Sequence, residues 1–376
     1  TIDIPSLQGN VDLSKVKLNK GLKALRAKVL LPDGYDEHPG QAYPLLYLLH
    51  GADDTSDTWA LDYKGDVTRT AKDFPGIIVM PEGGKGWFVD WWKAGKLNGP
   101  RWTKYYLDEV VPAIEARYRV KPGRQFHAIG GVSMGGYGAM FLAGQLPGYF
   151  GTIVAMSTPV DSQDPSNLLG SWFATGSSYE TVWGGLNRQY ATAHNPLKTI
   201  VNVASSRVLL SVGNGENDPK VPFEFARTVL GPILELNLLA GAVKYGVNAP
   251  LVGAHPLIKL QRGVHDWYYW RRHLEAAIKG DLFQQPRIPT TAEARHWKYR
   301  TMEPAGTAWG IGYRFTKPPT KIAYLARSGA KLTGTGAGEV TVNPGAADSD
   351  ASGAGTRPDC SFTATLPFER TLPDGC

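Results

Sequence analysis

The sequence predicts an α/β fold, with a mainly parallel sheet that helices cover on both faces, followed by a small all-β module. Two observations lead to this prediction. Up to about residue 285, short apolar runs alternate with segments of helical spacing. Beyond residue 290 the alternation stops, and short β-like runs follow one another between Gly-, Pro- and Ser-rich turns. The chain has 376 residues, enough for one large and one small domain.

The strands expected in the first part are short apolar runs, the second of which reads as fully buried. They cover residues 24–31, 43–49, 76–81, 125–132, 151–157 and 206–213, with a weaker segment at 249–252. Residues 105–118 have helical spacing, with Leu107, Val110, Val111, Ile114 and Tyr118 on one side. Further helices are expected over residues 136–146 and 273–283. This order of elements is that of a parallel sheet with helical crossovers.

Two segments interrupt or end the alternation. Residues 158–205 carry polar turns and scattered aromatic side chains, and we interpret them as a cap-like insertion beside the sheet. The stretch "QQPRIP" reads as a linker. We therefore expect a catalytic domain over residues 1–285 and a C-terminal β-rich module over residues 290–376. The module is predicted from the runs "AWGIGYRF", "KIAYLAR", "GEVTVN" and "SFTATL".

Charge and composition narrow the class of protein. The net charge is +6 and the pI is about 9.1, but the basic residues are scattered rather than grouped in a block. This pattern argues against a nucleic-acid-binding surface and suits a protein near an anionic envelope. No run of 18 apolar residues is present, so no transmembrane segment is expected. The chain starts at Thr1 without a signal peptide, and we take it as a mature form.

Cys360 and Cys376 are the two cysteines of the chain. They are expected to close one loop by a disulfide, which implies an oxidising compartment. Two unpaired thiols are the alternative.

The segment "AIGGVSMGGYGAM" holds the clearest chemical motif. Gly131-Val132-Ser133-Met134-Gly135 matches G-x-S-x-G, with an apolar strand before it and a helix after it. In such a strand-to-helix turn the serine hydroxyl is pushed into the open, and small neighbours keep the approach clear. Ser133 is therefore predicted to be a nucleophile rather than part of a plain tight turn.

A serine nucleophile needs a base, and eight histidines compete for this role. His265 in "RGVHDWYYW" follows a candidate last strand and precedes a helix, and the neighbouring Gly263 frees the loop. His50 directly follows a buried strand, where a loop-shaping role is expected, and His255 lies in an insertion-like stretch. His265 is the predicted base.

The orienting acid should lie between the serine and the histidine in the chain. Asp218 in "GNGENDPKVP" lies in the loop after the strand that ends at Gly213, from which a carboxylate can point at an imidazole. Asp218 is the predicted acid. Glu216 and Glu224 are the alternative candidates. Without a catalytic role, Asp218 would be a helix N-cap and Glu224 a solvated charge on a helix.

The oxyanion of the reaction needs two backbone N–H groups. Met134, directly after the nucleophile, supplies one. Ala52, in the loop after the strand at 43–49, is expected to supply the other. The aromatic residues near these loops are candidates to line an acyl- or sugar-binding cleft, although core packing explains any single one equally well. The candidates are Trp87, Phe88, Trp91, Trp92, Trp172 and Trp267.

These motifs together resemble the esterase D-like family of α/β-hydrolases, and in particular its secreted actinobacterial members, which include mycolyltransferases. The resemblance is carried by "YPLLYLLHG", "MPEGG", "GWFVDWW", "GVSMGG", "VWG", "NPL", "GNG" and "HDWYYW" in this order, over about residues 20–283. It implies an α/β-hydrolase fold and a serine-dependent acyl-enzyme on carboxylic esters. It carries over Ser133, His265, Ala52 and Met134. The mycolyltransferases take their acid from a glutamate on a helix after "GNG", for which Glu224 is the nearest counterpart here.

We therefore expect a secreted or cell-envelope-associated serine esterase or acyltransferase that needs neither cofactor nor metal. Its substrate is an acyl ester, with a glycolipid or an acylated polymer as candidates. Two alternatives stay open. One is transfer of a long acyl chain to a sugar, as in the mycolyltransferases. The other is an inert hydrolase scaffold whose β-module binds the cell envelope.

Overall fold

The computed structural model describes residues 1–92, 99–166, 176, 178–185, 188–221, 223–280, 282–283, 294–344, 360–374 and 376. Within these residues one large sheet has the strand order β1-β2-β4-β3-β5-β6-β7-β8. The strands are β1 Ile2–Asp3, β2 Arg26–Leu30, β3 Leu45–Leu49, β4 Ile77–Pro81, β5 His127–Val132, β6 Thr152–Met156, β7 Arg207–Gly213 and β8 Leu257–Gln261. β1, β2 and β4 pair antiparallel, and every other neighbouring pair is parallel. The predicted, mainly parallel sheet is confirmed.

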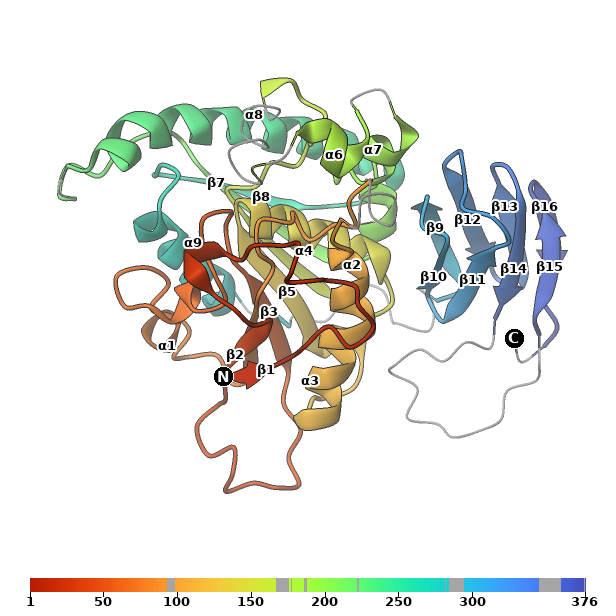
Figure 1. Ribbon diagram of the computed structural model, residues 1–376, viewed down its shortest axis with the longest axis horizontal. Helices are drawn as coiled ribbons and strands as arrows, with labels where there is room; N and C mark the ends of the chain where they lie inside the picture. The colour runs from red at the N-terminus through yellow and green to blue at the C-terminus, as the bar shows by residue number, and fades with distance from the viewer. Residues whose placement is uncertain are drawn as a thin grey trace.

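Helices cover both faces of this sheet (Figure 1). Because side chains alternate along a strand, Leu45, Tyr47 and Leu49 of β3 join one core while Leu46 and Leu48 join the other. The first core includes residues of α3 Val111–Arg117, α4 Met134–Gln145 and α8 Gly231–Asn248. The second includes residues of α1 Val67–Thr70 and α9 Trp267–Lys279. The result is a three-layer α/β/α arrangement.

Short helices fill the connections. They are η1 Asn19–Gly21, η2 Thr58–Ala60, α2 Trp102–Lys104, η3 Tyr105–Val110, η4 Arg124–Phe126, η6 Ala226–Leu230 and η7 Ala249–Val252. The helix expected over 105–118 is split into η3, a π-helix, and α3. Pro112 near the start of α3 cannot donate a backbone hydrogen bond into the turn before it.

The weak strand expected at residues 249–252 is wrong. These residues form η7, with Pro250 in its first turn, and the last strand of the sheet is β8, five residues further on. β8 lies at the edge of the sheet, and its residues are exposed or half-buried. An edge strand of this kind lacks the continuous apolar run by which the inner strands are recognised.

The insertion between β6 and β7 contains α6 Tyr179–Trp183, α7 Gln189–Ala193 and η5 Ile200–Val203. Asn195 and Asp161, 34 residues apart, are joined by a side-chain hydrogen bond of 2.7 Å. In Figure 1, α6 and α7 lie beside α8 at the top of the molecule. An ion pair of 2.5 Å between Asp164 and Lys244 links the insertion to α8.

The C-terminal module is built from two four-stranded antiparallel sheets, with strand orders β10-β11-β14-β15 and β16-β13-β12-β9. Its strands are β9 His296–Thr301, β10 Ala305–Ala308, β11 Ile311–Phe315, β12 Ala323–Ser328, β13 Lys331–Thr335, β14 Glu339–Asn343, β15 Phe362–Thr365 and β16 Phe368–Thr371. The sheets enclose a core of their own, and Cys360 is disulfide-bonded to Cys376. The "QQPRIP" linker lies outside the described residues.

The module contacts the insertion and the helices beside it. The side chain of Asn202 exchanges two hydrogen bonds with the backbone of Arg300, at 2.9 and 2.8 Å. His194 approaches Glu303 at 3.0 Å. A small apolar cluster of Ala193, Met302 and Ile322 also spans this junction. The two parts therefore have separate cores and a specific, largely polar contact.

Candidate active site

Ser133 stands at the turn between β5 and α4. Its backbone has φ 55° and ψ −119°, a strained conformation for a residue other than glycine. Its N–H donates to the carbonyl of Met156 at the end of β6, at 2.9 Å. Val132 and Met134 are buried while Ser133 is half-buried. The turn thus exposes the serine at the carboxyl end of the sheet, as expected for a nucleophile elbow.

The neighbouring glycines are needed for this turn. A Cβ atom on Gly131 would lie 2.4 Å from the backbone of Gly135, and one on Gly135 would lie 2.4 Å from the carbonyl oxygen of Leu49. No side chain fits at either distance. The tight crossing of β5, the first turn of α4 and the end of β3 therefore explains the small residues on both sides of Ser133.

His265 lies in the loop between β8 and α9. Its Nδ1 lies 3.1 Å from Oε2 of Glu235, and because a carboxylate only accepts, Nδ1 carries the proton. The edge of the Trp270 ring system packs against the imidazole, with ring centroids 4.8 Å apart. Asp266 caps α9 by accepting a hydrogen bond from the N–H of Tyr268 at 2.9 Å. The histidine is held by its carboxylate partner, the ring beside it and the fixed start of the next helix.

Glu235 is fully buried on the sheet-facing side of α8. Its Oε1 accepts hydrogen bonds from the hydroxyl of Ser157, at 2.7 Å, and from the N–H of Gly213. The indole N–H of Trp270 in turn donates to the Ser157 hydroxyl at 2.9 Å, so Trp270, Ser157 and Glu235 form a continuous series of hydrogen bonds. Burial by itself would raise the pKa of Glu235, but His265 and these donors outweigh burial and lower it. Glu235 is therefore kept as a carboxylate.

The structure does not pair the predicted acid Asp218 with His265. The Asp218 carboxylate accepts from the N–H of Lys220 at 3.0 Å and from the hydroxyl of Tyr268 at 3.3 Å, and Arg272 lies 3.8 Å away. Asp218 thus holds its own loop and the outer side of α9. It lies beyond the end of β7, whereas the carboxylate at His265 comes from α8.

The rival acids are also engaged elsewhere. Glu224 is exposed and accepts from the N–H of Arg227 at 2.7 Å, and Glu216 lies 3.6 Å from Arg262. Sequence reasoning missed Glu235, although a signal was present. The buried positions of α8 repeat with helical spacing as Gly231, Glu235, Leu238, Ala242 and Tyr245. Glu235 is the one charged residue in that stripe, and a buried acid on an apolar face is a recognisable anomaly.

The loop after β3 carries Ala52, the predicted second oxyanion donor. His50 is buried, and its Nδ1 lies 2.8 Å from the carbonyl oxygen of Gly51, which belongs to the same peptide group as the Ala52 N–H. Burial opposes a charge on His50, yet the adjacent Glu82 carboxylate raises the pKa of this histidine. On the other side, the Asn19 amide donates to the carbonyl of Ala52 at 2.7 Å. The peptide groups before and after Ala52 are therefore each held by a side chain.

The predicted substrate-binding tryptophans have different surroundings. Trp87 is buried between Tyr137 and Trp183, and Trp267 is buried between Trp59 and Trp270. These two, like the fully buried Phe88, are packing residues, so the prediction that they line a cleft is not supported. Trp91 and Trp92 are half-buried, and Trp92 packs on Tyr190 and under the Arg188 guanidinium. Trp172 lies outside the described residues.

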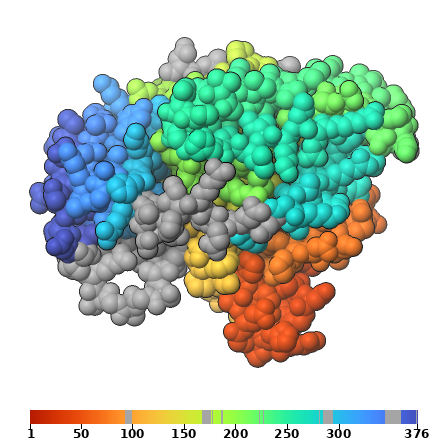
Figure 2. Space-filling view, turned by 180° about the vertical axis from the view of Figure 1, so that it is seen from behind, coloured from red at the N-terminus to blue at the C-terminus, as the bar shows by residue number. Residues whose placement is uncertain are grey.

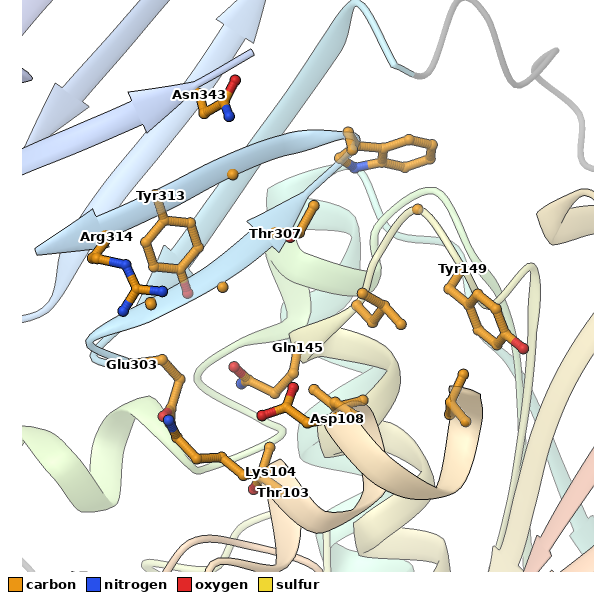
Figure 3. Close-up of a pocket in the computed structure, with 18 of the residues that line it drawn as sticks. Thr103, Lys104, Asp108, Gln145, Tyr149, Glu303, Thr307, Tyr313, Arg314 and Asn343 are labelled. Atoms are coloured by element: carbon orange, nitrogen blue, oxygen red, sulfur yellow. The ribbon is translucent and has the colours of Figure 1, made fainter. Parts of the chain in front are cut away.

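A cavity of about 720 Å³ in the described part of the chain does not lie at Ser133. It lies between the helices at residues 103–115 and the β-module, as Figure 3 shows for Lys104 and Asp108 on one side and Tyr313 and Arg314 on the other. Neither Ser133, Glu235 nor His265 lines it. No group of three or more potential metal ligands occurs among the described residues. The site described above thus rests on its hydrogen-bonded residues, not on the size of a cavity.

Comparison with known proteins gives this geometry a family context. A family model described as "Putative esterase" matches residues 23–280. The chain is 32% identical over 194 residues to Esterase Rv1288 of Mycobacterium tuberculosis (strain ATCC 25618 / H37Rv), in a match that covers 49% of this chain and 42% of that protein. It is 27% identical over 270 residues to the diacylglycerol acyltransferase/mycolyltransferase Ag85B of Mycobacterium leprae (strain TN), covering 65% of this chain and 77% of that protein. The match thus spans less than half the length of the mycobacterial esterase.

Solved structures support the same fold. MPT51 (FbpC1) of Mycobacterium tuberculosis superimposes with a TM-score of 0.56 at 20% identity, over 76% of this chain and 98% of that one. FphF of Staphylococcus aureus, described as a fluorophosphonate-binding serine hydrolase, gives a TM-score of 0.55 at 20% identity, over 70% and 94% of the two chains. At this level of identity the likeness shows the fold alone.

Proposed function

The chain belongs to the esterase family whose model matches residues 23–280, and we propose that it works as a serine carboxylic-ester hydrolase or acyltransferase through an acyl-enzyme on Ser133. The observation that carries the proposal is the pair formed by His265 Nδ1 and the buried Glu235 carboxylate, at 3.1 Å. Ser133, Ser157 and His265 follow the ends of strands β5, β6 and β8, and Gly213 is the last residue of the neighbouring strand β7. This supports one site at the carboxyl edge of the sheet.

In the proposed reaction the Ser133 hydroxyl attacks the ester carbonyl, and Nε2 of His265 takes its proton. Glu235 keeps the proton of His265 on Nδ1 and stabilises the imidazolium that forms. The N–H groups of Met134, in the first turn of α4, and Ala52 stabilise the oxyanion. The protonated His265 then gives its proton to the leaving alcohol. Water or a sugar hydroxyl, activated by the same histidine, releases the acyl group from Ser133.

The second candidate is transfer of a long acyl chain to a sugar. It is favoured by the 27% identity to a mycolyltransferase over 65% of this chain. Hydrolysis and transfer share the same residues and differ in the acceptor that reaches the acyl-enzyme. An inert scaffold with an envelope-binding β-module is disfavoured, because Ser133, His265 and Glu235 are all present.

We also propose that the protein is secreted or associated with the cell envelope and acts on an acyl ester, with a glycolipid or an acylated polymer as candidates. The Cys360–Cys376 disulfide supports an oxidising compartment. None of the helices in the described part of the chain is long and apolar enough to cross a membrane.

The nucleophile is tested by labelling and mutation. A fluorophosphonate probe is expected to modify Ser133, as shown by peptide mass spectrometry. Ser133→Ala should lose the label and lower kcat on a p-nitrophenyl ester by about 10⁴-fold or more, with an unchanged circular dichroism spectrum. Labelling at another residue, or an alanine variant with full activity, would overturn the mechanism.

Hydrolysis and transfer are separated by product analysis. The enzyme is given a p-nitrophenyl ester with and without trehalose or another sugar, and the products are identified by mass spectrometry. Free acid in both reactions assigns a hydrolase. An acylated sugar that replaces the free acid assigns a transferase. Absence of turnover with either acceptor, in protein that also fails to bind the fluorophosphonate, would favour the inert scaffold.

A further inference from the structure

Exposed apolar side chains are concentrated on one part of the surface. In the described residues, all but three of the large hydrophobic side chains that are exposed belong to a single segment, residues 223–260. The three exceptions are Leu7, Tyr63 and Tyr324. We call this surface the apolar face, and its members are Phe223, Phe225, Val229, Leu230, Ile233, Leu234, Leu236, Val243, Val247, Leu251, Val252, Leu257 and Leu260. A monomeric soluble protein rarely exposes so many neighbouring apolar side chains.

Helix α8 provides the centre of the apolar face. Its inner stripe, from Gly231 to Tyr245, packs toward the sheet, so a polar outer side would be expected. Instead Ile233 and Val247 are each 68% exposed on the outside, and Val243 is 56% exposed. Lys244 is the one charged residue of α8 besides the buried Glu235. The helix is thus apolar on both sides. Asp164 and Ser166 of the insertion contact Lys244 and Asn237 of α8, while Ile233, Val243 and Val247 remain exposed.

Cations surround the apolar face. Residues 219–262 contain Lys220, Arg227, Lys244, Lys259 and Arg262, whereas Glu224 is their only carboxylate besides the buried Glu235. Arg227, Lys244 and Arg262 are paired with acids outside the segment, Asp266, Asp164 and Glu216. Among the described residues, Lys220 and Lys259 are the cations of this segment that form no ion pair, and they supply its unbalanced positive charge.

At the far end of the apolar face, Leu251 and Val252 border a groove of about 440 Å³ between η7 and the β-module. Apolar side chains of η5 line the groove, together with the cations Lys198, Lys298 and Arg300. No carboxylate is among its lining residues. Lys298 and Arg300 lie two positions apart on β9, so their side chains leave the same side of the strand. An apolar wall beside unopposed cations suits an anionic headgroup with an acyl chain.

We propose that the apolar face and this cationic groove dock the protein on an anionic lipid surface. The apolar side chains enter the interface, while Lys198, Lys298 and Arg300 bind the phosphates of the headgroups. Figure 2 shows residues from about 220 to 260, in green and teal, spread over the upper part of the molecule with the blue β-module at one side. The docking does not depend on the proposed function.

A second copy of the chain is the main competing occupant. A two-fold interface would place the same patch on both partners, so the cations around the apolar face would meet their own copies. The chain as a whole also carries a net charge of +6. Like charge on both partners disfavours self-association and favours an anionic surface.

Docking would matter for catalysis because α8 carries the centre of the apolar face as well as Glu235. A lipid surface that contacts the apolar face therefore touches the helix whose Glu235 orients His265. This link between docking and catalysis rests on the proposed function. If it holds, the substrates are esters held in a lipid layer.

The test measures binding of the full chain to vesicles, with Ser133→Ala as the background so that turnover plays no part. Vesicles of phosphatidylcholine with and without phosphatidylglycerol are sedimented, and the bound fraction is measured at low and high salt. Binding is expected to need phosphatidylglycerol and to weaken with salt. Val243→Asp with Val247→Asp should lower the partition coefficient at least about tenfold, because two apolar insertions are lost. Lys198→Gln with Lys298→Gln should weaken binding to the anionic vesicles.

The matched control is Leu7→Asp with Tyr63→Asp, two exposed apolar residues outside the apolar face, and it should bind as the parent does. To check that Val243→Asp/Val247→Asp is folded, the two substitutions are also made in the protein that keeps Ser133, and its activity on a soluble p-nitrophenyl ester is measured. If that variant does not fold, the lysine variant decides. The proposal is overturned by an absence of vesicle binding, by equal binding to both vesicle types, or by equal loss in the control. It is also overturned by sedimentation of the lipid-free protein as a dimer that Val243→Asp/Val247→Asp dissociates.

Discussion

At the scale of single residues, Glu235 is held more firmly than any other acid near His265. Its two oxygens accept from His265, Ser157 and Gly213, and it has no exposed surface. A buried carboxylate with this many donors is fixed in both charge and direction. Asp218, in contrast, sits in a solvent-facing loop with its own local partners.

The choice of acid is testable by a matched pair of amides. Glu235→Gln is expected to lower kcat by about 10⁴-fold, because an amide cannot stabilise the imidazolium or hold the required tautomer. Asp218→Asn should keep activity within about tenfold of the parent, since it loses only a loop contact. Steady-state kinetics on a p-nitrophenyl ester compare the two. A larger loss in Asp218→Asn than in Glu235→Gln would return the role to Asp218.

The sequence predicted those residues of the site that lie in a local motif. The neighbouring glycines indicate Ser133, and the position in a loop between a strand and a helix indicates His265. The acid has no short motif of this kind. Its signal is a lone carboxylate in an otherwise apolar stretch of α8, and its approach to His265 depends on how α8 packs across the ends of β6 and β7. The resemblance to the mycolyltransferases placed the acid on a helix, which is the kind of element where Glu235 lies, but pointed to Glu224. Glu224 precedes α8, and its carboxylate contacts Arg227.

At the scale of elements, Asp90 joins three parts of the fold. It lies in the loop after β4, it is buried, and its carboxylate accepts from the N–H of Lys104 at 3.2 Å. Burial and the charge of Glu303, from the β-module, raise the pKa of Asp90 to about 7, although Lys104 and His194 oppose this. The junction between the domains thus contains a carboxyl group that is protonated below neutral pH.

The raised pKa of Asp90 predicts a pH dependence of stability. In the unfolded chain this carboxyl has a pKa near 3.9, so between about pH 4 and pH 7 the folded protein holds a proton that the unfolded chain has lost. The free energy of unfolding should therefore fall as pH rises through this range. Asp90→Asn should lack this fall in stability and be more stable than the parent at pH 8, by on the order of 4 kcal/mol. Urea unfolding at a series of pH values measures both slopes.

The control for Asp90→Asn is Asp36→Asn, which changes an exposed acid of the same type. It should leave the pH dependence of the parent intact. If Asp90→Asn has the same slope between pH 4 and pH 7 as the parent, Asp90 is not the titrating group.

At the scale of the whole molecule, the inner sheet was predictable and its edge was not. β3 and β4 are buried on both faces and read as unbroken apolar runs. β8 and α8 break this rule because each keeps apolar residues toward solvent, so neither pattern shows which side faces the core. In the β-module four runs were recognised, which correspond to β11, β12, β14 and β15. The other four strands, β9, β10, β13 and β16, were missed, because they are rich in polar or small residues. The contact between the two domains depends on surface residues with no sequence pattern of their own.

The two domains have separate cores, so the chain should tolerate a cut near residue 290. Removal of residues 290–376 should leave a folded catalytic domain, because the two cores around the large sheet contain no residue of the β-module. The truncated protein should lose stability through the contacts at the junction between the domains. Arg124 is fully buried and stacks on Trp309 at 4.7 Å, and Asn202 loses both hydrogen bonds to Arg300. We expect Tm to fall by about 5 °C, which corresponds to roughly 2 kcal/mol for a domain of this size.

Differential scanning calorimetry and kinetics on a p-nitrophenyl ester check this prediction. The truncated protein should turn over the soluble ester at a rate near that of the full chain, since Ser133, Glu235 and His265 all lie in the part that remains. On an insoluble acylated substrate it should be slower, because the groove that holds Lys298 and Arg300 is lost with the module. A truncated protein that aggregates, or that lacks a cooperative unfolding transition, would show that the sheet needs the module to complete its core, and the boundary near residue 290 would be wrong.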